Sequence, residues 1–310
     1  MPQFGSHVSV AGGLHRGIER ALEVGCDCLQ VFTKNNNRWA AKPLEEAAVD
    51  AWRKAFQASD LKHPIAHASY LINLAAPDDK LFAKSVDALV DELQRATRLG
   101  LEGVVVHPGA YTTSCEADGL KRIVDGATEV LQRLAGPDAV DRAELPADAP
   151  GCRLLLENTA GQGSCLGHSV DHLAELVQQI SSQVDGLGGR PSADQLGVCL
   201  DTCHAFAAGV DWNDPDALVA YRTRLQDELP VGSVRALHLN DSKKPLGSRV
   251  DRHEHIGRGA IGEAGFVRIL TDEFFAEIPG YLETEKGVDE ASGNDWDVVN
   301  LSVLRRLAAA

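Results

Sequence analysis

Eight short apolar segments alternate with longer amphipathic segments along the whole chain. Between the apolar segments lie stretches such as 78–100, in which apolar residues recur every three or four positions, the period of a helix that packs on one face. Eight strand–helix units within 310 residues predict an α/β fold, a single closed (β/α)8 barrel of the TIM-barrel type. The predicted strands cover residues 4–10, 28–34, 63–69, 103–109, 153–159, 196–202, 234–240 and 280–286.

The strand segments are apolar throughout, as expected for parallel strands that are buried on both faces. No linker interrupts the pattern, so residues 1–310 are predicted to form one domain. Two polar stretches, 136–151 and 182–195, are expected to be loop insertions. Because each precedes a strand, both insertions should lie at the end of the barrel opposite the carboxyl ends of the strands.

Six consecutive predicted strands end in a side chain that can bind a metal ion. The carboxyl ends of the strands are where barrel enzymes keep their active sites. Unpaired carboxylates crowded at one barrel mouth would repel one another, so a positive charge must lie among them. The strand-end residues are His67, His107, Glu157, Asp201, His238 and Glu283.

Three further candidates, His204, Asp251 and His253, lie in segments close to the same rim. Nine nitrogen and oxygen ligands exceed the needs of one ion with four or five ligands, and they suit three ions if a carboxylate is shared. Mixed histidine and carboxylate ligation without thiolate favours zinc and leaves manganese, iron and cobalt open. The sequence therefore predicts a cluster of metal ions at the barrel mouth.

The formal net charge of −15 has the wrong sign for a protein that binds nucleic acid over its whole surface. A nucleic-acid site must therefore depend on local basic residues. Such residues follow the second and seventh strands, and they are Lys34, Arg38, Lys243, Lys244, Arg249, Arg252 and Arg258.

The start of the chain has no signal-peptide pattern, and no apolar run approaches the roughly 20 residues that cross a bilayer. The seven cysteines are odd in number and lack the spacing of a disulfide framework. We therefore expect a cytoplasmic protein with no membrane partner.

Long motifs surround the candidate ligands. They read "HASYLINLA" (67–75), "VVVHPGA" (104–110), "LLLENTAGQG" (154–163), "CLDTCHAFAAGVD" (199–211), "LHLNDSK" (237–243), "GSRVDRHEHIGRGAIG" (247–262) and "YLETEKG" (281–287). With "GSHVSVAGGL" (5–14) and "QVFTKN" (30–35), they resemble endonuclease IV, a family of metal-dependent apurinic/apyrimidinic endonucleases. The resemblance covers the chain from end to end apart from the two insertions.

The resemblance implies a (β/α)8 barrel with three zinc ions per chain that acts on double-stranded DNA as a monomer. The implied activity is hydrolysis of the phosphodiester 5′ to an abasic site, which leaves a 3′-hydroxyl and a 5′-deoxyribose phosphate, together with trimming of blocked 3′ ends. One zinc ion would be held by His67, His107 and Glu157. Glu157, the expected catalytic residue, would bridge to a second ion, and the remaining ligands would be Asp201, His238 and Glu283 for that ion and His204, Asp251 and His253 for the third.

The residues that would fill the gap at an abasic site differ from the family pattern at one position. Members of the family insert an arginine, a tyrosine and a leucine into the DNA, and Tyr70 and Leu71 match the last two. Asn37, itself expected to face DNA, holds the arginine position. Either the loop shifts so that Arg38 enters the gap, which we favour, or Tyr70 and Leu71 carry more of the work. Lys34, Arg249 and Arg252 are expected to bind DNA as well, while His7 and His255 are expected to support the metal ligands.

Two other functions remain open from the sequence. Sugar isomerases and epimerases use related barrels with one or two metal ions, but they need only about four ligands and have no use for His204, Asp251 and His253. A DNA- or metal-binding protein without catalytic activity is the other alternative, and the complete ligand set argues against it. The number of bound ions and cleavage of abasic DNA distinguish the three hypotheses.

Overall fold

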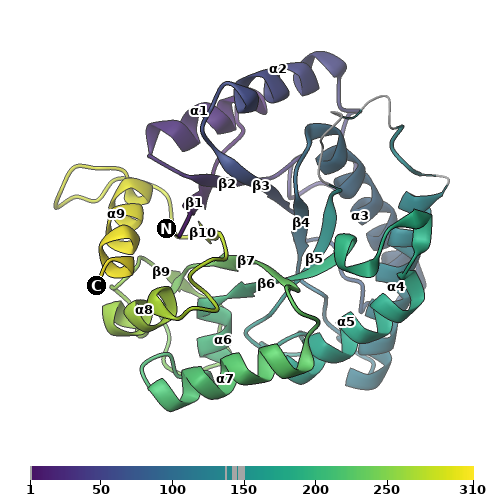
Figure 1. Ribbon diagram of the computed structural model, residues 1–310. Coiled ribbons are helices and arrows are strands. Elements are labelled where there is room, and N and C mark those ends of the chain that lie inside the picture. Colours follow the sequence, from purple (N-terminus) through teal and green to yellow (C-terminus); the bar gives the residue numbers. More distant parts are fainter. Residues whose placement is uncertain (1, 137, 142–144, 146–150) are drawn as a thin grey trace.

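A closed barrel of eight parallel strands forms the centre of the molecule (Figure 1), which confirms the predicted fold. The computed structural model describes residues 2–136, 138–141, 145 and 151–310. In their order around the barrel, the strands are β1 (Phe4–His7), β10 (Gly280–Leu282), β7 (Val234–His238), β6 (Leu196–Asp201), β5 (Arg153–Glu157), β4 (Gly103–Val106), β3 (Lys62–His67) and β2 (Cys28–Val31).

Helices surround the barrel and cover the outer faces of its strands (Figure 1). The helix predicted within residues 78–100 is α3, where the Asp78 side chain accepts a hydrogen bond from the Leu81 amide and Gly100 ends the helix in a left-handed conformation. The helices are α1 (His15–Glu23), α2 (Glu46–Gln57), α3 (Asp79–Leu99), α4 (Glu116–Ala135), α5 (Val170–Val184), α6 (Thr202–Ala208), α7 (Pro215–Glu228), α8 (Gly262–Thr271) and α9 (Trp296–Ala308).

The interior of the barrel is filled by one layer of buried side chains that is separate from the larger core between strands and helices. Side chains two residues apart on a strand point to the same side. The residue two positions after each member of the layer therefore also points into the barrel, and it lies at the barrel mouth. The layer consists of Cys28, Ile65, Val105, Leu155, Cys199, Ala236 and Tyr281.

A short antiparallel hairpin stands at the mouth beside β7. Its strands are β8 (Asp241–Ser242) and β9 (His253–Glu254), and we call residues 241–254 the β8–β9 hairpin. The Asp241 carboxylate accepts backbone hydrogen bonds from Gly257, Gly259 and Ile261, which fixes the chain that leaves the hairpin. A Cβ atom on Gly259 would lie 2.4 Å from the Ser242 carbonyl oxygen, so only glycine fits there.

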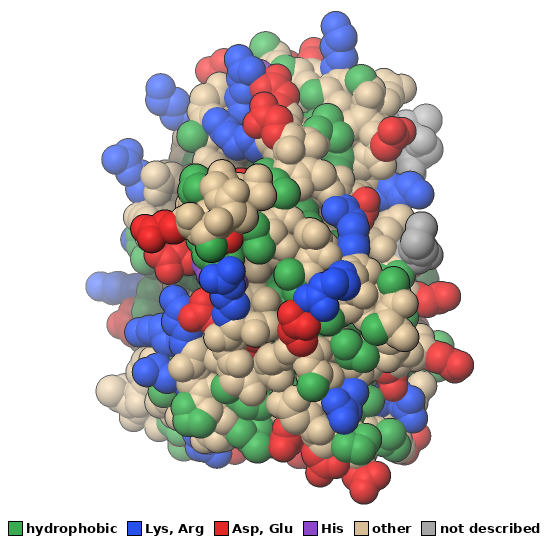
Figure 2. All heavy atoms as spheres, turned by 90° about the vertical axis from the view of Figure 1, so that its left-hand side faces the viewer, with side chains coloured by type: hydrophobic (Ala, Val, Ile, Leu, Met, Phe, Trp, Pro, Cys, Tyr) green, Lys and Arg blue, Asp and Glu red, His purple; other side chains and the backbone are tan. Residues whose placement is uncertain are grey.

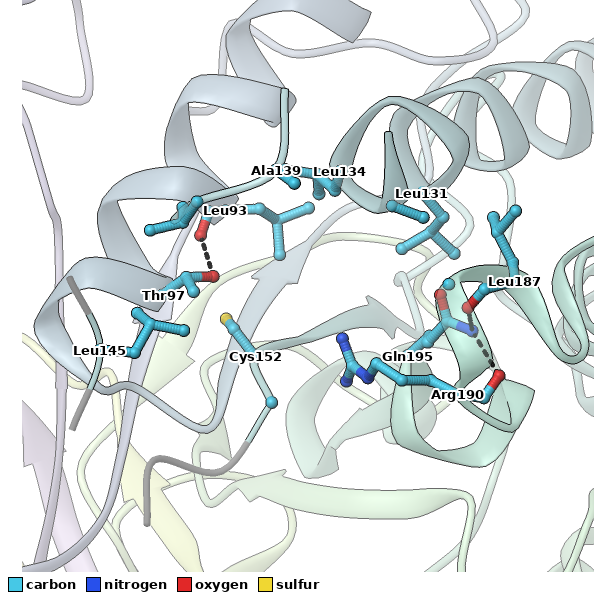
Figure 3. A pocket seen from close by; sticks show the side chains of 14 residues that line it. Leu93, Thr97, Leu131, Leu134, Ala139, Leu145, Cys152, Leu187, Arg190 and Gln195 are labelled. Atoms are coloured by element: carbon cyan, nitrogen blue, oxygen red, sulfur yellow. Dashed lines mark hydrogen bonds between the residues drawn. The ribbon is translucent and has the colours of Figure 1, made fainter. Parts of the chain in front are cut away.

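The two expected insertions lie beside β5 and β6. Residues 137, 142–144 and 146–150 of the first fall outside the described residues, while the second contains two 3-10 turns, η2 (Leu187–Gly189) and η3 (Ser192–Asp194). A largely apolar pocket of about 340 Å³ opens between these turns, α3 and α4, with Leu93, Leu131 and Leu187 around it (Figure 3). Cys152, at the amino end of β5, lines it, so this pocket lies at the end of the barrel away from the candidate ligands.

None of the helices in the described part of the chain has the length and apolar character needed to cross a membrane.

Candidate metal centre

The six strand-end candidates meet in one ring at the barrel mouth. Four of them, His67, Glu157, Asp201 and His238, are the last residues of β3, β5, β6 and β7, and the other two directly follow β4 and β10. Each lies two residues beyond a member of the inner layer, so all six side chains point into the barrel. We call this set the ligand ring, and it consists of His67, His107, Glu157, Asp201, His238 and Glu283.

Glu157 lies in the middle of the ligand ring with its side chain fully buried. Its Oε2 atom is 3.2 Å from Nε2 of His67 and 3.2 Å from Nε2 of His107. Its Oε1 atom is 2.9 Å from Nδ1 of His238 and 3.3 Å from Nδ1 of His204. The two carboxylate oxygens therefore face different groups of histidines, which is the arrangement that a bridging ligand requires.

Backbone carbonyls select which histidine nitrogens face the centre. Nδ1 of His67 donates to the Ala68 carbonyl at 2.7 Å, and Nδ1 of His204 lies 2.9 Å from the Asn158 carbonyl. His253 uses Nδ1 in the same way, 3.3 Å from the backbone oxygen of Glu283. A histidine whose one nitrogen donates to a carbonyl presents its other nitrogen as a neutral ligand.

The Nε2 atoms of His204 and His253 are buried and make no well-aligned hydrogen bond among the described residues, although carboxylate oxygens lie nearby. Both face Asp251, whose carboxylate oxygens lie 3.2 Å from Nε2 of His204 and 3.3 Å from Nε2 of His253. Buried polar atoms without a partner are rare in proteins and need an explanation. An ion among these three side chains would satisfy both nitrogens and the carboxylate.

Within the described part of the chain, ligand atoms gather into three groups in which every atom lies within 4.8 Å of the others. The chemistry of these donors fits zinc, because all are imidazole nitrogens or carboxylate oxygens. Glu157 belongs to two of these groups, and Asp201 also belongs to two. The groups are His67, His107 and Glu157; Glu157, Asp201, His238 and Glu283; and Asp201, His204 and His253.

The buried charges of the centre stabilise one another. Burial acts to raise the pKa of Glu157, but the imidazoles of His238 and His107 hold that pKa well below its usual range. Burial lowers the pKa of His204, whereas Asp201 and Asp251 raise it, and the net result lies well above the ordinary value. Without metal, a proton on His204 therefore offsets part of the carboxylate charge, and a metal ion must displace that proton to bind.

Two amide side chains that were not singled out in the sequence hold the ligands in place. Oε1 of Gln30 accepts from Nε2 of His238 at 2.9 Å, and Nε2 of Gln30 donates to Oε1 of Glu283 at 2.6 Å. Asn240 donates to Oδ2 of Asp201 at 2.6 Å. Gln30 lies two residues beyond Cys28 of the inner layer, as each member of the ligand ring lies two residues beyond its own inner-layer residue. The alternation of side chains along β2 is therefore a sequence signal that points to Gln30.

The two histidines expected to support the ligands have different surroundings. Nδ1 of His7 lies 3.4 Å from Oε1 of Glu283 and 2.9 Å from Nε2 of Gln30, so His7 does contact the ligand ring. His255 does not fit its expected place beside His253. Its ring stacks on Trp296 at 3.6 Å and its Nδ1 pairs with the Asn300 side chain, contacts that belong to the packing around α9.

Tyr70 and Arg38 lie at the rim, as a role in DNA binding requires. The Tyr70 side chain is 55% exposed, and its ring centroid is 5.1 Å from that of His67 and 5.9 Å from that of His107. Leu71 is partly buried beside it, while Asn37 and Arg38 are exposed.

Lys34, which was expected to bind DNA, is buried rather than exposed. Its side chain is only 2% exposed, and its ammonium group donates to the Asp91 carboxylate of α3 at 2.7 Å. A direct contact between Lys34 and DNA is therefore a wrong expectation, because the ammonium group is already buried in an ion pair.

The mouth of the barrel is hollow, with a pocket of about 410 Å³ above the ligand ring. Arg252 lines it and Arg249 is exposed on the same hairpin, where its backbone takes the left-handed value φ 52°. On the face turned toward the viewer in Figure 2, acidic and basic side chains are interspersed, in keeping with local rather than global basic charge. The pocket is lined by Tyr70, His107, His204, Lys243, Asp251, Arg252, His253, Glu283 and Glu285.

Comparison with known proteins places this geometry in a family. A family model described as "Xylose isomerase-like TIM barrel" matches residues 18–304. The protein named "Probable endonuclease 4" of Chloroflexus aggregans is 42% identical over 307 residues, which cover 99% of this chain and 98% of that protein. The chain belongs to the endonuclease IV family.

The solved structures agree with this assignment to the endonuclease IV family. The crystal structure of endonuclease IV from Thermus thermophilus matches with a TM-score of 0.79 at 35% identity, over 99% of both chains. A D-tagatose 3-epimerase-like protein matches with a TM-score of 0.68 at 18% identity, a likeness of fold alone. The resemblance inferred from the motifs is confirmed. This endonuclease IV homologue has, among its described residues, three groups of side chains at the barrel mouth that could hold metal ions.

Proposed function

We propose that the protein is a DNA-repair endonuclease that uses three zinc ions to hydrolyse the phosphodiester 5′ to abasic sites. The products would be a 3′-hydroxyl and a 5′-deoxyribose phosphate, and blocked 3′ ends would be trimmed by the same site. The observation that carries this proposal is the position of Glu157 between two groups of potential ligands, with a third group beside them. Full-length similarity to endonuclease 4 supports the same activity.

The ligand ring and the β8–β9 hairpin would hold the ions. His67, His107 and Glu157 form one site, and Asp251 joins His204 and His253 in the third. The middle site consists of Glu157, Asp201, His238 and Glu283. Bound divalent ions would supply Lewis-acid chemistry, polarising the scissile phosphate and making water a better nucleophile.

The charges of the chain are suited to a phosphodiester only once metal is bound. The site has four carboxylates, those of Glu157, Asp201, Asp251 and Glu283, against which three divalent ions would leave a net positive centre. The pocket above the ligand ring would then attract the negatively charged DNA backbone. The rest of the protein, with its net negative charge, would repel that backbone. Arg249 and Arg252 on the hairpin add local positive charge at the rim.

An abasic nucleotide must leave the base stack to reach ions below the rim. Tyr70 would perform this task, and its exposed ring close to those of His67 and His107 supports that role. Its ring would occupy the gap on the DNA side while the sugar–phosphate enters the mouth.

A metal-dependent sugar isomerase or epimerase remains the alternative, since its barrel is similar in fold. Such an enzyme would leave His204, Asp251 and His253 without a purpose at the mouth. A cytoplasmic location and a monomeric state stay predictions.

The test is nicking of a supercoiled plasmid that carries abasic sites, with the undamaged plasmid as control. We expect nicking only of the damaged plasmid, loss of nicking after treatment with a chelator, and recovery when zinc is restored. Metal-loaded protein that leaves abasic plasmid intact would refute the proposal, and one ion per chain would favour the isomerase.

A further inference from the structure

A buried ion pair fastens the segment that follows β2 to helix α3. Nζ of Lys34 lies 2.7 Å from Oδ2 of Asp91 and 3.7 Å from Oε1 of Glu92, and the Lys34 and Glu92 side chains are only 2% and 1% exposed. The Thr33 hydroxyl also donates to the Glu92 carboxylate. Buried charges are costly unless they are paired and hydrogen-bonded, so moving Lys34 or Glu92 out of this arrangement would cost free energy.

Helix α3 contacts the same segment again further along, and we call residues 32–45 the β2–α2 loop. Arg95 donates from Nε to Oδ1 of Asp91 at 2.9 Å and from its guanidinium to the Lys42 carbonyl. The Lys84 ammonium lies 4.3 Å from the centroid of the Trp39 ring. The loop is thus held at its start, middle and end by a single rigid helix.

The β2–α2 loop is also joined to the β3–α3 loop, residues 68–78. The Ser69 hydroxyl donates to the Asn36 carbonyl at 2.6 Å. Burial raises the pKa of Glu92, while Lys34, the Thr33 hydroxyl and the backbone amide of Ser69 act against this shift. Glu92 therefore faces groups from both loops at once.

We propose that Glu92, with Lys34 as its counter-ion, is a positioning residue that fixes the two loops relative to each other for recognition of abasic DNA. One loop presents Arg38 and Asn37 to solvent, and the other presents Tyr70 directly after Ser69. Both loops must enter the same gap in the DNA, so their relative position determines binding. This inference rests on the proposed function and gives Lys34 a role that needs no contact with DNA.

The test compares Glu92→Gln with Asp87→Asn, a matched control on α3 whose carboxylate pairs with Arg133 at the surface. In Glu92→Gln we expect faster hydrogen exchange in residues 33–42 and 68–72, unchanged metal content and unchanged kcat on abasic duplex. We expect KM to rise roughly tenfold, the equivalent of about 1.4 kcal/mol of binding. Asp87→Asn should change none of these quantities.

Thr33→Val provides a milder second variant, since it removes the hydroxyl bond to Glu92 and leaves the ion pair intact. It should raise KM in the same direction by a smaller factor, so the proposal stays testable if Glu92→Gln does not fold. Unchanged loop exchange and KM in both variants would overturn the positioning role, as would a fall in kcat accompanied by loss of metal. Hydrogen exchange needs no DNA, so a wild-type protein that fails to cleave abasic DNA counts against the proposed function alone.

Discussion

The side-chain oxygen of Gln30 lies 2.9 Å from Nε2 of His238. An amide oxygen can only accept, so His238 must carry its proton on Nε2 and present Nδ1 to Glu157 and Glu283. The Gln30 amide nitrogen donates to Glu283 at the same time. One neutral side chain thereby sets the ring orientation of one candidate ligand and the position of another.

Replacing Gln30 should therefore weaken the middle metal site. In Gln30→Leu the His238 ring loses its partner and Glu283 loses a donor, and such supporting contacts are worth about 10- to 100-fold in metal affinity. We expect a lower zinc content after dialysis against a weak chelator, measured by elemental analysis. Gln179→Leu, an exposed change on α5, is the matched control, and equal zinc content in the two variants would contradict the positioning of His238 by Gln30.

Glu157→Gln should abolish cleavage and spare DNA binding. The amide keeps the shape of the side chain, but it removes the charge that two groups of histidines share. We expect the cleavage rate of abasic duplex to fall by at least about 10²-fold, with binding measured by gel shift little changed. Glu175→Gln on the outer surface of α5 serves as control. A near wild-type rate in Glu157→Gln would show that Glu157 does not bridge.

The hairpin ligands should account for a single ion. Purified protein is expected to hold about three ions per chain, mostly zinc. The double variant Asp251→Ala/His253→Ala removes two ligands of the third group and leaves the ligand ring complete, so it should hold about one ion fewer. Elemental analysis with an Asp211→Ala control checks the count. A wild-type content of one ion or fewer contradicts the trinuclear centre.

Arg38 and Tyr70 should both contribute to binding of abasic duplex, since both are exposed at the rim on loops that touch each other. We expect Arg38→Ala and Tyr70→Ala each to weaken binding by about 1–3 kcal/mol, with Asn37→Ala close to wild type. Parallel titrations of abasic and intact duplex measure the effect. Normal binding by Arg38→Ala together with failure of Tyr70→Ala would assign the wedge to the β3–α3 loop alone.

Metal should stabilise the fold more strongly as the pH rises. In metal-free protein the pKa of His204 lies well above its ordinary value of 6.5, so its contribution to stability is complete below pH 6.5 and is lost as the pH rises through the raised pKa. The pKa of Glu157 lies well below 4.5, so its contribution persists throughout that range. Carboxylates without protonated partners then repel one another. The difference in Tm between zinc-loaded and stripped protein should widen from pH 6 to pH 9, and a constant difference would contradict this account.

The sequence predicts the barrel and the ligand ring because both depend on local pattern. His67 and Glu157 each end an apolar run, and period-two alternation carries their side chains to the mouth. Gln30 follows the same alternation, but an amide side chain is not a usual zinc ligand. Its residue type therefore gave no reason to predict a place at the metal centre.

Contacts between distant segments explain the residues whose surroundings differ from expectation. Lys34 belongs to a segment with the basic residues expected of a DNA-binding loop. Only the fold shows that its ammonium group pairs with Asp91, 57 residues away in the sequence. His255 adjoins two candidate ligands in sequence, yet its ring packs on Trp296 because the chain turns after β9. Pairing across the fold decides both cases, and a single sequence carries no record of it.

Asp251 and His253 reach the centre on the β8–β9 hairpin, whereas the ligand ring is anchored in the barrel wall. The ligands of the ring cannot move apart without their strands, whereas the third group would lose Asp251 and His253 if the hairpin moved. Exchange of ions with the surroundings is therefore expected in two kinetic phases, with the shorter residence time at the hairpin. When zinc is scarce, the enzyme would then lose activity by losing one readily replaced ion while the barrel stays folded. Activity would return without refolding once zinc is available again.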